Sequence, residues 1–394
     1  MTIQKSITIF LVVAFFSVAS VAHLSATAVF AQEMSLEAQN TQDTQEREFQ
    51  TGTVKEVLDE QTIVVDGTTF YTQKVQVVND ETGEVSEVDV GNEVQPLSDA
   101  QRISVGTKVV LSDQTDYDGN KYTVITDVLR IPVLIFVSVL FFLLVAVVGG
   151  IRGVFSILGM FATFLVLGLY MLPAILQGTN PVFVSVVSSF VIAFLTIYLA
   201  HGFNKKSHIS FISITSVLAV VVFLASFVVK ASRLMGLGDE QSYFLQFGNL
   251  GSINLQGLFL AGIIIGALGV LDDIVVAQVS VVEQLLSVEK KMGKQELYFR
   301  ALEVGKDHVA SLVNTLVLAY AGTSLPLFLL FFVNKDIPTW VKINDQTVAE
   351  EIVRTITGSI GLVLAVPVTT LLAVVLLKQK DVENKKGWEL HHHH

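Results

Sequence analysis

The stretch Gly257–Gln284, GLFLAGIIIGALGVLDDIVVAQVSVVEQ, decides the fold of this chain. It is apolar and long enough to cross a membrane as a helix, because a span needs about 20 predominantly apolar residues. At helical spacing one face holds only small or polar residues: Gly262, Gly266, Gly269, Asp273, Ala277 and Ser280. Small residues allow a neighbouring backbone to approach closely. The stretch therefore predicts a helix packed inside a membrane bundle, with Gly262, Gly266 and Gly269 as its packing face.

Two acids, Asp272 and Asp273, lie inside this predicted span. A carboxylate at the bilayer centre costs roughly 2.5–3.5 kcal/mol or more, so an intramembrane acid indicates a functional site. Adjacent residues on a helix point about 100° apart, and only Asp273 continues the glycine face. We therefore expect Asp273 to point into the bundle, and Asp272 to face another helix or the membrane interface.

The composition is that of a polytopic membrane protein. The chain has 394 residues, of which 52% are hydrophobic and 15% are charged. Seven apolar runs are long enough to span, at about 131–148, 154–176, 182–199, 209–229, 255–276, 309–333 and 352–377. We predict a helical transmembrane domain over 129–378. Within it, residues 287–308 are expected to form a cytoplasmic amphipathic connector.

Residues 1–31 have the pattern of a signal peptide. A short basic start precedes an apolar run, and Val29 and Ala31 suit positions −3 and −1 of a cleavage site. The alternative is an uncleaved N-terminal anchor, because the apolar run is nearly long enough to span. Both interpretations place the following segment outside the cytoplasm. Lys and Arg residues concentrate in the loops of the opposite side, which agrees with a cytoplasmic C-terminus.

A second, polar domain follows the leader. Residues 32–48 are predicted to be a flexible tether. Residues 49–128 then alternate at period two in short strands, expected at 51–57, 62–65, 69–78, 84–90, 108–112 and 121–127. Such strands predict a small extracytoplasmic β-barrel, OB-like in its order. The chain's net charge of −11 is concentrated here, which argues against nucleic acid. Residues 379–394, ending in HHHH, are taken as a cytoplasmic tail.

Polar residues on neighbouring spans can join the acids. Asn314 and Thr315 lie in the sixth apolar run and Thr370 in the seventh, at a depth similar to that of Asp273. Together they could form one cluster that takes up and releases a proton or another ion. The alternative is a purely structural clamp, in which Asp273 stays protonated or bonds to Asn314. Arg354, near the outer edge of the last run, is expected to snorkel towards the interface.

The residue inventory excludes several chemistries. The absence of Cys rules out disulfides, thiolate metal sites and Cys nucleophiles. Intramembrane aspartyl proteolysis needs two facing carboxylates, normally from two helices, whereas Asp272 and Asp273 are adjacent on one. The acids near Asp113 lack the Gly and terminal Glu spacing of an EF-hand. We therefore expect no enzyme, no metal site and no cofactor.

Three strings carry a family resemblance: GALGVLDDIVVAQ (Gly266–Gln278), ELYFRALEVGKDHVASLVNTLVLAYAGTSLPL (Glu296–Leu327) and AEEIVRTITGSIGLVLAVPVTT (Ala349–Thr370). In them the chain resembles the YibE/F family of bacterial membrane proteins, in its Gram-positive LDD-type branch. The likeness covers nearly all of the chain after the leader. It implies a bacterial plasma-membrane protein but no particular activity. Other members keep one acid, which matches Asp273.

A weaker resemblance is to the membrane half of the SecD/SecF proteins and the wider RND transporters. An acid-bearing helix is there followed by a basic connector and two more spans, and that acid bears on proton coupling. This implies a coupling role for Asp273 and pairing of two chains. The large periplasmic domains of that superfamily are not matched here.

These observations predict a proton- or ion-coupled transporter, or an export-assisting protein, that uses a buried Asp on the fifth span. The alternative is a non-transporting scaffold or envelope-assembly factor with the Asp as a helix clamp. The expected partners are membrane lipid and a second membrane subunit, either a homo-oligomer or a pair with a related protein. The sequence indicates no substrate.

Overall fold

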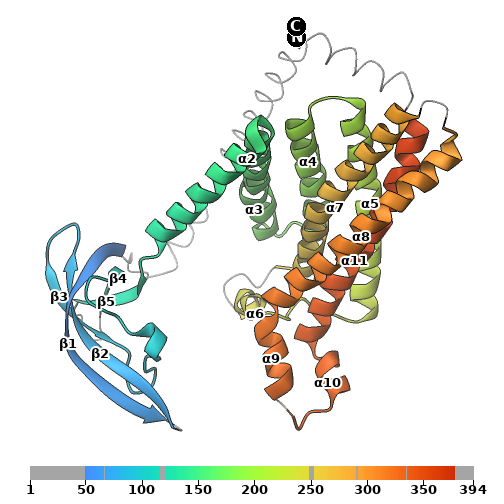
Figure 1. Cartoon of the computed structure of the whole chain (residues 1–394). Helices are drawn as coiled ribbons and strands as arrows, with labels where there is room; N and C mark the ends of the chain where they lie inside the picture. Colours follow the sequence, from blue (N-terminus) through green and yellow to red (C-terminus); the bar gives the residue numbers. More distant parts are fainter. Residues whose placement is uncertain are drawn as a thin grey trace, which may run out of the picture. The chain divides into compact units, whose positions relative to one another are not determined.

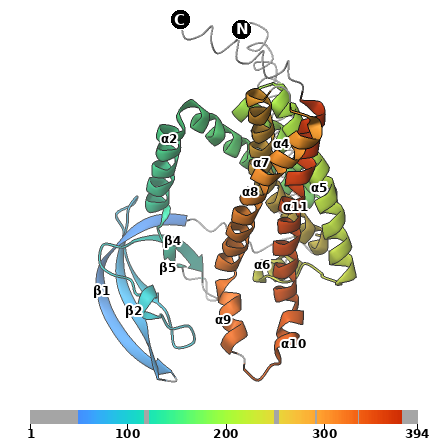
Figure 2. The ribbon, with the colours of Figure 1, turned by 45° about the vertical axis from the view of Figure 1, so that its right-hand side comes forward.

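The computed structural model describes residues 49–65, 67–115, 121–247, 253–289, 292–333 and 335–377. They form two compact units that join between Val147 and Val148: a β-sheet unit and a helical unit. Figure 1 and Figure 2 label the elements of both. The predicted leader 1–31, tether 32–48 and tail 379–394 lie outside the described residues.

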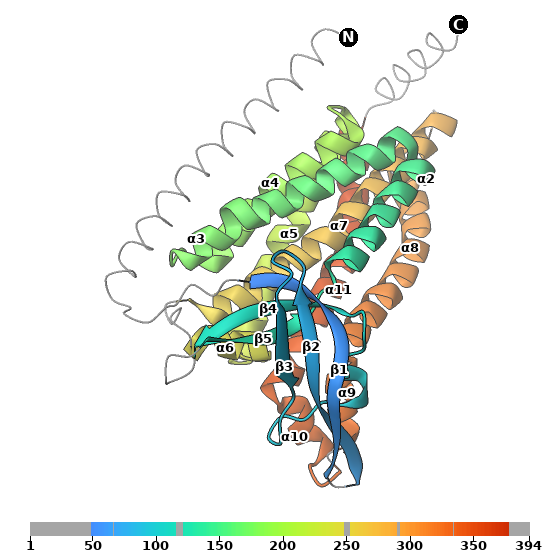
Figure 3. The same cartoon turned by 90° about the vertical axis from the view of Figure 1, so that its left-hand side faces the viewer.

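The N-terminal unit contains an antiparallel sheet of five strands in the order β3-β2-β1-β4-β5, followed by the first half of the helix that begins at Ile131. The strands are β1 (Phe49–Val65), β2 (Thr68–Asn79), β3 (Val85–Val90), β4 (Lys108–Thr115) and β5 (Lys121–Val128). Their alternation buries one face, and the core consists mainly of Val54, Val75, Val77, Val109 and Leu111. Figure 3 shows the long β1 and β2 curving together.

One predicted feature of this sheet differs in the structure, and a second stays a prediction. The first two predicted strands are one 17-residue strand, β1, with irregular register at Val54/Glu56 and Val57/Asp59. Bulges bend a strand without ending it, so the polar residues there did not mark a turn. β3 and β5, at the two ends of the strand order, approach each other as in an OB-like barrel. No ladder joins them among the described residues, so barrel closure stays a prediction.

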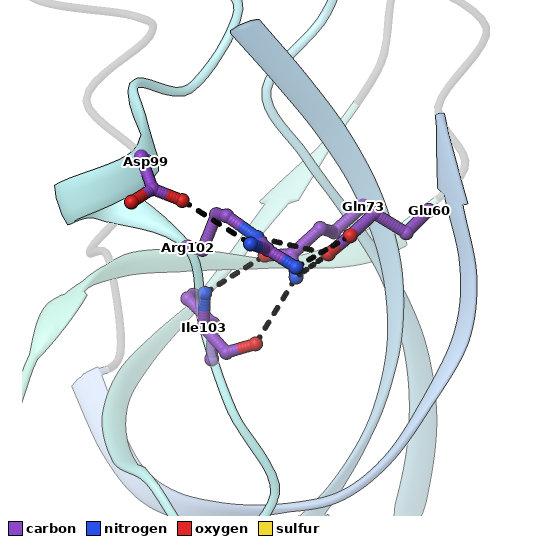
Figure 4. Close-up of polar contacts among 5 residues, drawn as sticks. All are labelled: Glu60, Gln73, Asp99, Arg102 and Ile103. Atoms are coloured by element: carbon purple, nitrogen blue, oxygen red, sulfur yellow. Dashed lines mark hydrogen bonds and ion pairs between the residues drawn. The ribbon is translucent and has the colours of Figure 1, made fainter. Parts of the chain in front are cut away.

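A polar network braces this sheet (Figure 4). Arg102 Nη2 donates to Glu60 Oε1 at 2.6 Å, and its Nη1 donates to Asp99 at 3.1 Å. The buried Gln73 amide pairs with the Ile103 backbone: Nε2 donates to the Ile103 carbonyl at 3.1 Å, and Oε1 accepts the Ile103 N–H at 2.8 Å. The network ties the connection between β3 and β4 to β1 and β2.

The helical elements follow in chain order: α2 (Ile131–Val166), η2 (Leu167–Met171), α3 (Leu172–Leu176), α4 (Pro181–His201), α5 (Lys205–Ala231), α6 (Glu240–Phe247), α7 (Leu255–Val288), α8 (Lys294–Thr323), α9 (Leu325–Val333), α10 (Thr339–Asn344) and α11 (Gln346–Leu376). The side chains of Asn180, Asn204, Asn254 and Asp345 cap α4, α5, α7 and α11 by accepting N–H groups of the first turn. Such caps explain why these helices begin where they do.

The described residues contain five helical stretches that are long and apolar enough to cross a membrane, or six if the α8–α9 pair is one span. The predicted count of seven is therefore not confirmed. The first two predicted runs lie in one stretch of 46 residues, Ile131–Leu176. It is broken at Gly150, whose φ of 56° is readily open only to glycine. An unbroken helix of that length would measure about 69 Å, more than twice the roughly 30 Å of a bilayer core.

The sixth predicted run is also interrupted. α8 and α9 meet at a bend of 66° around Ser324. Pro326 explains the bend, because a proline is tolerated in the first turn of α9 but cannot continue α8. The predicted connector 287–308 is not a separate helix: α7 runs to Val288, and Lys294 already begins α8.

α7 is the central helix of the bundle and packs against α4, α5, α8 and α11. Apolar side chains on these helices form two main clusters at successive depths. One includes Ile214, Ile274 and Val366 of α5, α7 and α11. The other includes Ile209, Val279 and Ala373 of the same three helices.

Candidate functional site

The two acids of α7 lie in different surroundings. Asp272 faces Thr196 of α4. Its Oδ1 is enclosed and has no hydrogen-bond partner among the described residues. Asp273 is exposed in the helical unit. The bundle thus covers Asp272 more than Asp273, the reverse of the order expected from the glycine face.

The glycine face of α7 is only partly covered by the described helices. Gly262, Gly269 and Asp273 are exposed, and Gly266 is half-buried. A Cβ on Gly266 would lie 3.2 Å from the Tyr320 hydroxyl, whereas one on Gly269 would meet nothing within 4 Å. The face therefore lines an open surface that ends at Asp273.

The structure does not assemble the predicted polar cluster. Asn314 and Thr315 are exposed on α8, and the Thr315 hydroxyl donates to Ser311 of its own helix at 3.1 Å. Thr370 is buried on α11. Within the described ranges, no hydrogen bond joins either acid of α7 to these three residues, so the Asp273–Asn314 clamp is not formed there.

Gln278, which was not among the predicted site residues, connects three helices. Its side chain is fully buried. Nε2 donates to the Ala301 carbonyl of α8 at 2.9 Å and to the Thr370 hydroxyl of α11 at 2.7 Å. Both partners are acceptors, because Thr370 donates its own proton to Val366. The amide orientation is therefore fixed, and Oε1 remains without a partner in the part of the chain that the structure describes.

Gly305 of α8 gives Gln278 its space. A Cβ at this position would lie 2.8 Å from Gln278 Oε1 and would also meet Val366. Two features of the sequence could have located this contact. Gln278 is an amide side chain inside an apolar run, and Gly305 is a glycine inside the charged segment EVGKDH. Neither residue carries a charge. The predicted site was built around the two charged residues of this helix, so Gln278 and Gly305 were not included in it.

Gln278 belongs to a layer of polar residues that divides the bundle core. Ser210 and Ser213 of α5 and Thr369 of α11 are also at most 1% exposed. On each of the three helices these residues lie between members of the two apolar clusters. The Ser210, Ser213 and Thr369 hydroxyls have no partner among the described residues. Neutral oxygens of this kind suit water or a hard cation.

A second polar centre holds the other end of the bundle. The Glu350 carboxylate of α11 is 2% exposed. It accepts the backbone N–H groups of Gly236, Leu237 and Gly238 at 2.8, 3.1 and 3.0 Å. The Gln346 amide adds a fourth bond at 2.8 Å. These contacts, the Glu350 clasp, fix the α5–α6 connection to the start of α11. Successive N–H groups that surround an anion form a backbone nest.

Arg354, which we expect to snorkel towards the interface, lies one turn after the clasp. Its guanidinium lies over the Phe259 ring of α7, 5.2 Å from the centroid. Nε is 3.3 Å from the Glu351 carboxylate. The side chain therefore packs against the bundle, and its reach towards the interface stays a prediction.

Comparisons with known proteins give one match. A family model described as YibE/F-like protein matches residues 137–379, which include α3 to α11 and most of α2. No curated protein matches the chain, and no solved structure does. These comparisons therefore do not support the weaker SecD/SecF resemblance.

Proposed function

The chain belongs to the YibE/F-like family of membrane proteins, and from this premise we propose that it is an ion-coupled transporter or export-assisting protein whose coupling groups are the two acids of α7. The coupling ion is a proton or another small cation. The bundle performs the coupling, since it contains the acids, the polar layer and nearly the whole family match.

The enclosed carboxyl of Asp272 is the observation that carries this proposal. Its Oδ1 is inaccessible and lacks a hydrogen-bond partner among the described residues. A membrane helix keeps such a group at a cost in free energy, which function explains more readily than packing. Asp273, the next residue, is open to its surroundings. In this proposal a proton enters at Asp273 and passes to its enclosed neighbour.

The polar layer supports the same function. Gln278 follows Asp272 by six residues, which is about 9 Å along a helix. Its Oε1 and the hydroxyls of Ser210, Ser213 and Thr369, which have no hydrogen-bond partner among the described residues, offer neutral oxygens between the two apolar clusters. Water or a cation held there would connect the acids with the end of the bundle where α7 finishes.

Proton flux into liposomes tests the proposal. The purified chain is reconstituted with an internal pH-sensitive dye, and a potassium diffusion potential drives protons inward. We expect Asp272→Asn to abolish the flux and Asp273→Asn to lower it at least tenfold. Asp307→Asn, at an exposed acid of α8, is the matched control and should conduct like the wild type. Wild-type flux in Asp272→Asn would sink the proposal.

The scaffold alternative predicts a different result. A structural clamp tolerates Asn in place of Asp, because the amide keeps the shape and the hydrogen-bonding capacity. Both variants would then keep full function in the cell, and Asn314→Leu would be the more harmful change. The absence of an acid–Asn314 bond from the described residues favours coupling over the clamp.

A further inference from the structure

A cavity of about 430 Å³ lies at the end of the bundle where α7 and α11 begin. Its walls come from α6, α7, α11 and the π-helical turn η2. Most of the lining is apolar, including Met171, Leu172, Leu245, Leu258, Phe259 and Ile265. The polar lining residues are Asp239, Gln241, Ser242, Glu350 and Arg354. An apolar cavity with a few polar groups at one end is typical of a ligand site.

Arg354 is the cation among the lining residues, and one edge of its guanidinium is free. Its Nε faces Glu351 at 3.3 Å, and the Phe259 ring supports its plane. Nη1 lies beside Gly262, where a Cβ would be 3.5 Å away. No hydrogen bond to either Nη atom is found in the described residues. A guanidinium with free N–H groups binds carboxylates and phosphates in bidentate fashion.

Each of the three nearby acids already has a partner among the described residues. Four N–H donors of the Glu350 clasp satisfy that carboxylate. Asp239 Oδ1 accepts the Ser242 N–H at 2.6 Å at the start of α6. Glu351 is occupied by the Nε edge of Arg354. The free edge of Arg354 is therefore the part of the lining that most favours an anion.

We propose that this cavity binds a membrane phospholipid, with the lipid phosphate on Arg354 and an acyl chain along Leu258, Phe259 and Ile265. The apolar walls distinguish an amphiphile from a free anion, because a small soluble anion would leave them in contact with water. Arg354 is eight residues into α11, about 12 Å from its start. A long side chain near a helix end can reach a lipid headgroup. This inference does not depend on the acids of α7.

Thermal unfolding of the purified chain in a neutral detergent tests the proposal with three probes. Lysophosphatidylglycerol carries both a phosphate and a chain, glycerol phosphate lacks the chain, and monoacylglycerol lacks the phosphate. We expect only lysophosphatidylglycerol to raise the melting temperature in a saturable way. Arg354→Gln should weaken its apparent affinity at least tenfold. Lys230→Gln, at an exposed cation of the last turn of α5 that does not line the cavity, should leave affinity unchanged.

The proposal fails if lysophosphatidylglycerol gives no saturable rise in the melting temperature of the wild type. It also fails if Arg354→Gln binds this lipid with the affinity of the wild type. An equal rise with glycerol phosphate alone would overturn it as well, because that result would indicate a site for free phosphate. If Arg354→Gln does not fold, Gly262→Val replaces it, since the added side chain crowds Nη1 and should weaken binding similarly. Asp272→Asn should bind the lipid like the wild type. Failure of proton coupling and failure of lipid binding are thus separate results.

Discussion

Gln278 shows how one neutral side chain can hold the bundle together. Its amide donates to α8 and to α11 from a fully buried position on α7. We expect Gln278→Leu to lower the free energy of unfolding by about 1–3 kcal/mol, because it removes two buried hydrogen bonds and leaves Thr370 with an unused acceptor. Gln284→Leu, at an exposed position of the same helix, is the control. Denaturant titration measures both, and equal stabilities would contradict the role of Gln278.

Gly305 permits the close approach of α8. We expect Gly305→Val to destabilise the protein by about 1–3 kcal/mol, because the new atoms would overpack the space beside Gln278 and Val366. Gly322→Ala on the same helix is the matched control, since a Cβ there meets nothing within 4 Å. Alanine favours a helix over glycine, so that variant should be as stable as the wild type or slightly more stable. Melting temperatures compare the pair.

At the residue scale the sequence located both acids but could not rank their burial. Adjacent residues on a helix diverge by a known angle, whereas the rotation of the helix in the bundle depends on all its neighbours. The glycine face was interpreted as the packed face because small residues allow close approach. Small residues allow a close approach of helices but do not require one. On α7 the large residues Ile264, Leu271 and Ile274 fill the core instead.

Among the elements, the Glu350 clasp makes the α5–α6 connection part of the bundle. We expect Glu350→Gln to speed amide hydrogen exchange at Gly236–Gly238, because a neutral amide holds these N–H groups less well than a carboxylate. Hydrogen bonds to a charged group contribute about 1.5–3 kcal/mol each, so the change should be large. Glu303→Gln, an exposed acid of α8, should leave exchange there unchanged. Exchange measured by mass spectrometry reports both, and unaltered protection in Glu350→Gln would refute the clasp.

Apolar run length predicted most helices but not their interruptions. Gly149 and Gly150 lie between the first two predicted runs. In the structure one helix, α2, covers this gap, and its backbone dihedral angles are non-helical at Gly150. The sixth run contains a bend at Ser324 that hydropathy does not register. The connector was separated from the sixth span because its residues are charged, although α8 contains most of the connector and the first part of that span. The polarity of a residue indicates whether water or lipid surrounds it. The ends of a helix are set by its backbone hydrogen bonds, which polarity does not report.

For the whole molecule, we expect the β-sheet unit outside the plasma membrane and the end of α7 in the cytoplasm. The natural absence of Cys makes introduced cysteines clean reporters. Val94→Cys in the sheet unit and Val288→Cys at the end of α7 are both highly exposed, at 88% and 85%. A membrane-impermeant maleimide should label the first in intact cells and the second only after permeabilisation. Labelling of both in intact cells would contradict this topology.

The class and family of the whole chain were predictable, and finer features were not. The composition and three sequence strings indicated a YibE/F-like membrane protein, and the family match over 137–379 confirms it. That match begins inside α2, so it says nothing about the sheet unit. Strand alternation predicted the sheet, but barrel closure depends on contacts between β3 and β5 that a periodic pattern does not encode.

The two hydrogen bonds of the Gln278 amide also determine what can move. Since they fasten α8 and α11 to α7 at one depth, a displacement of α7 at that depth would be transmitted to both helices together.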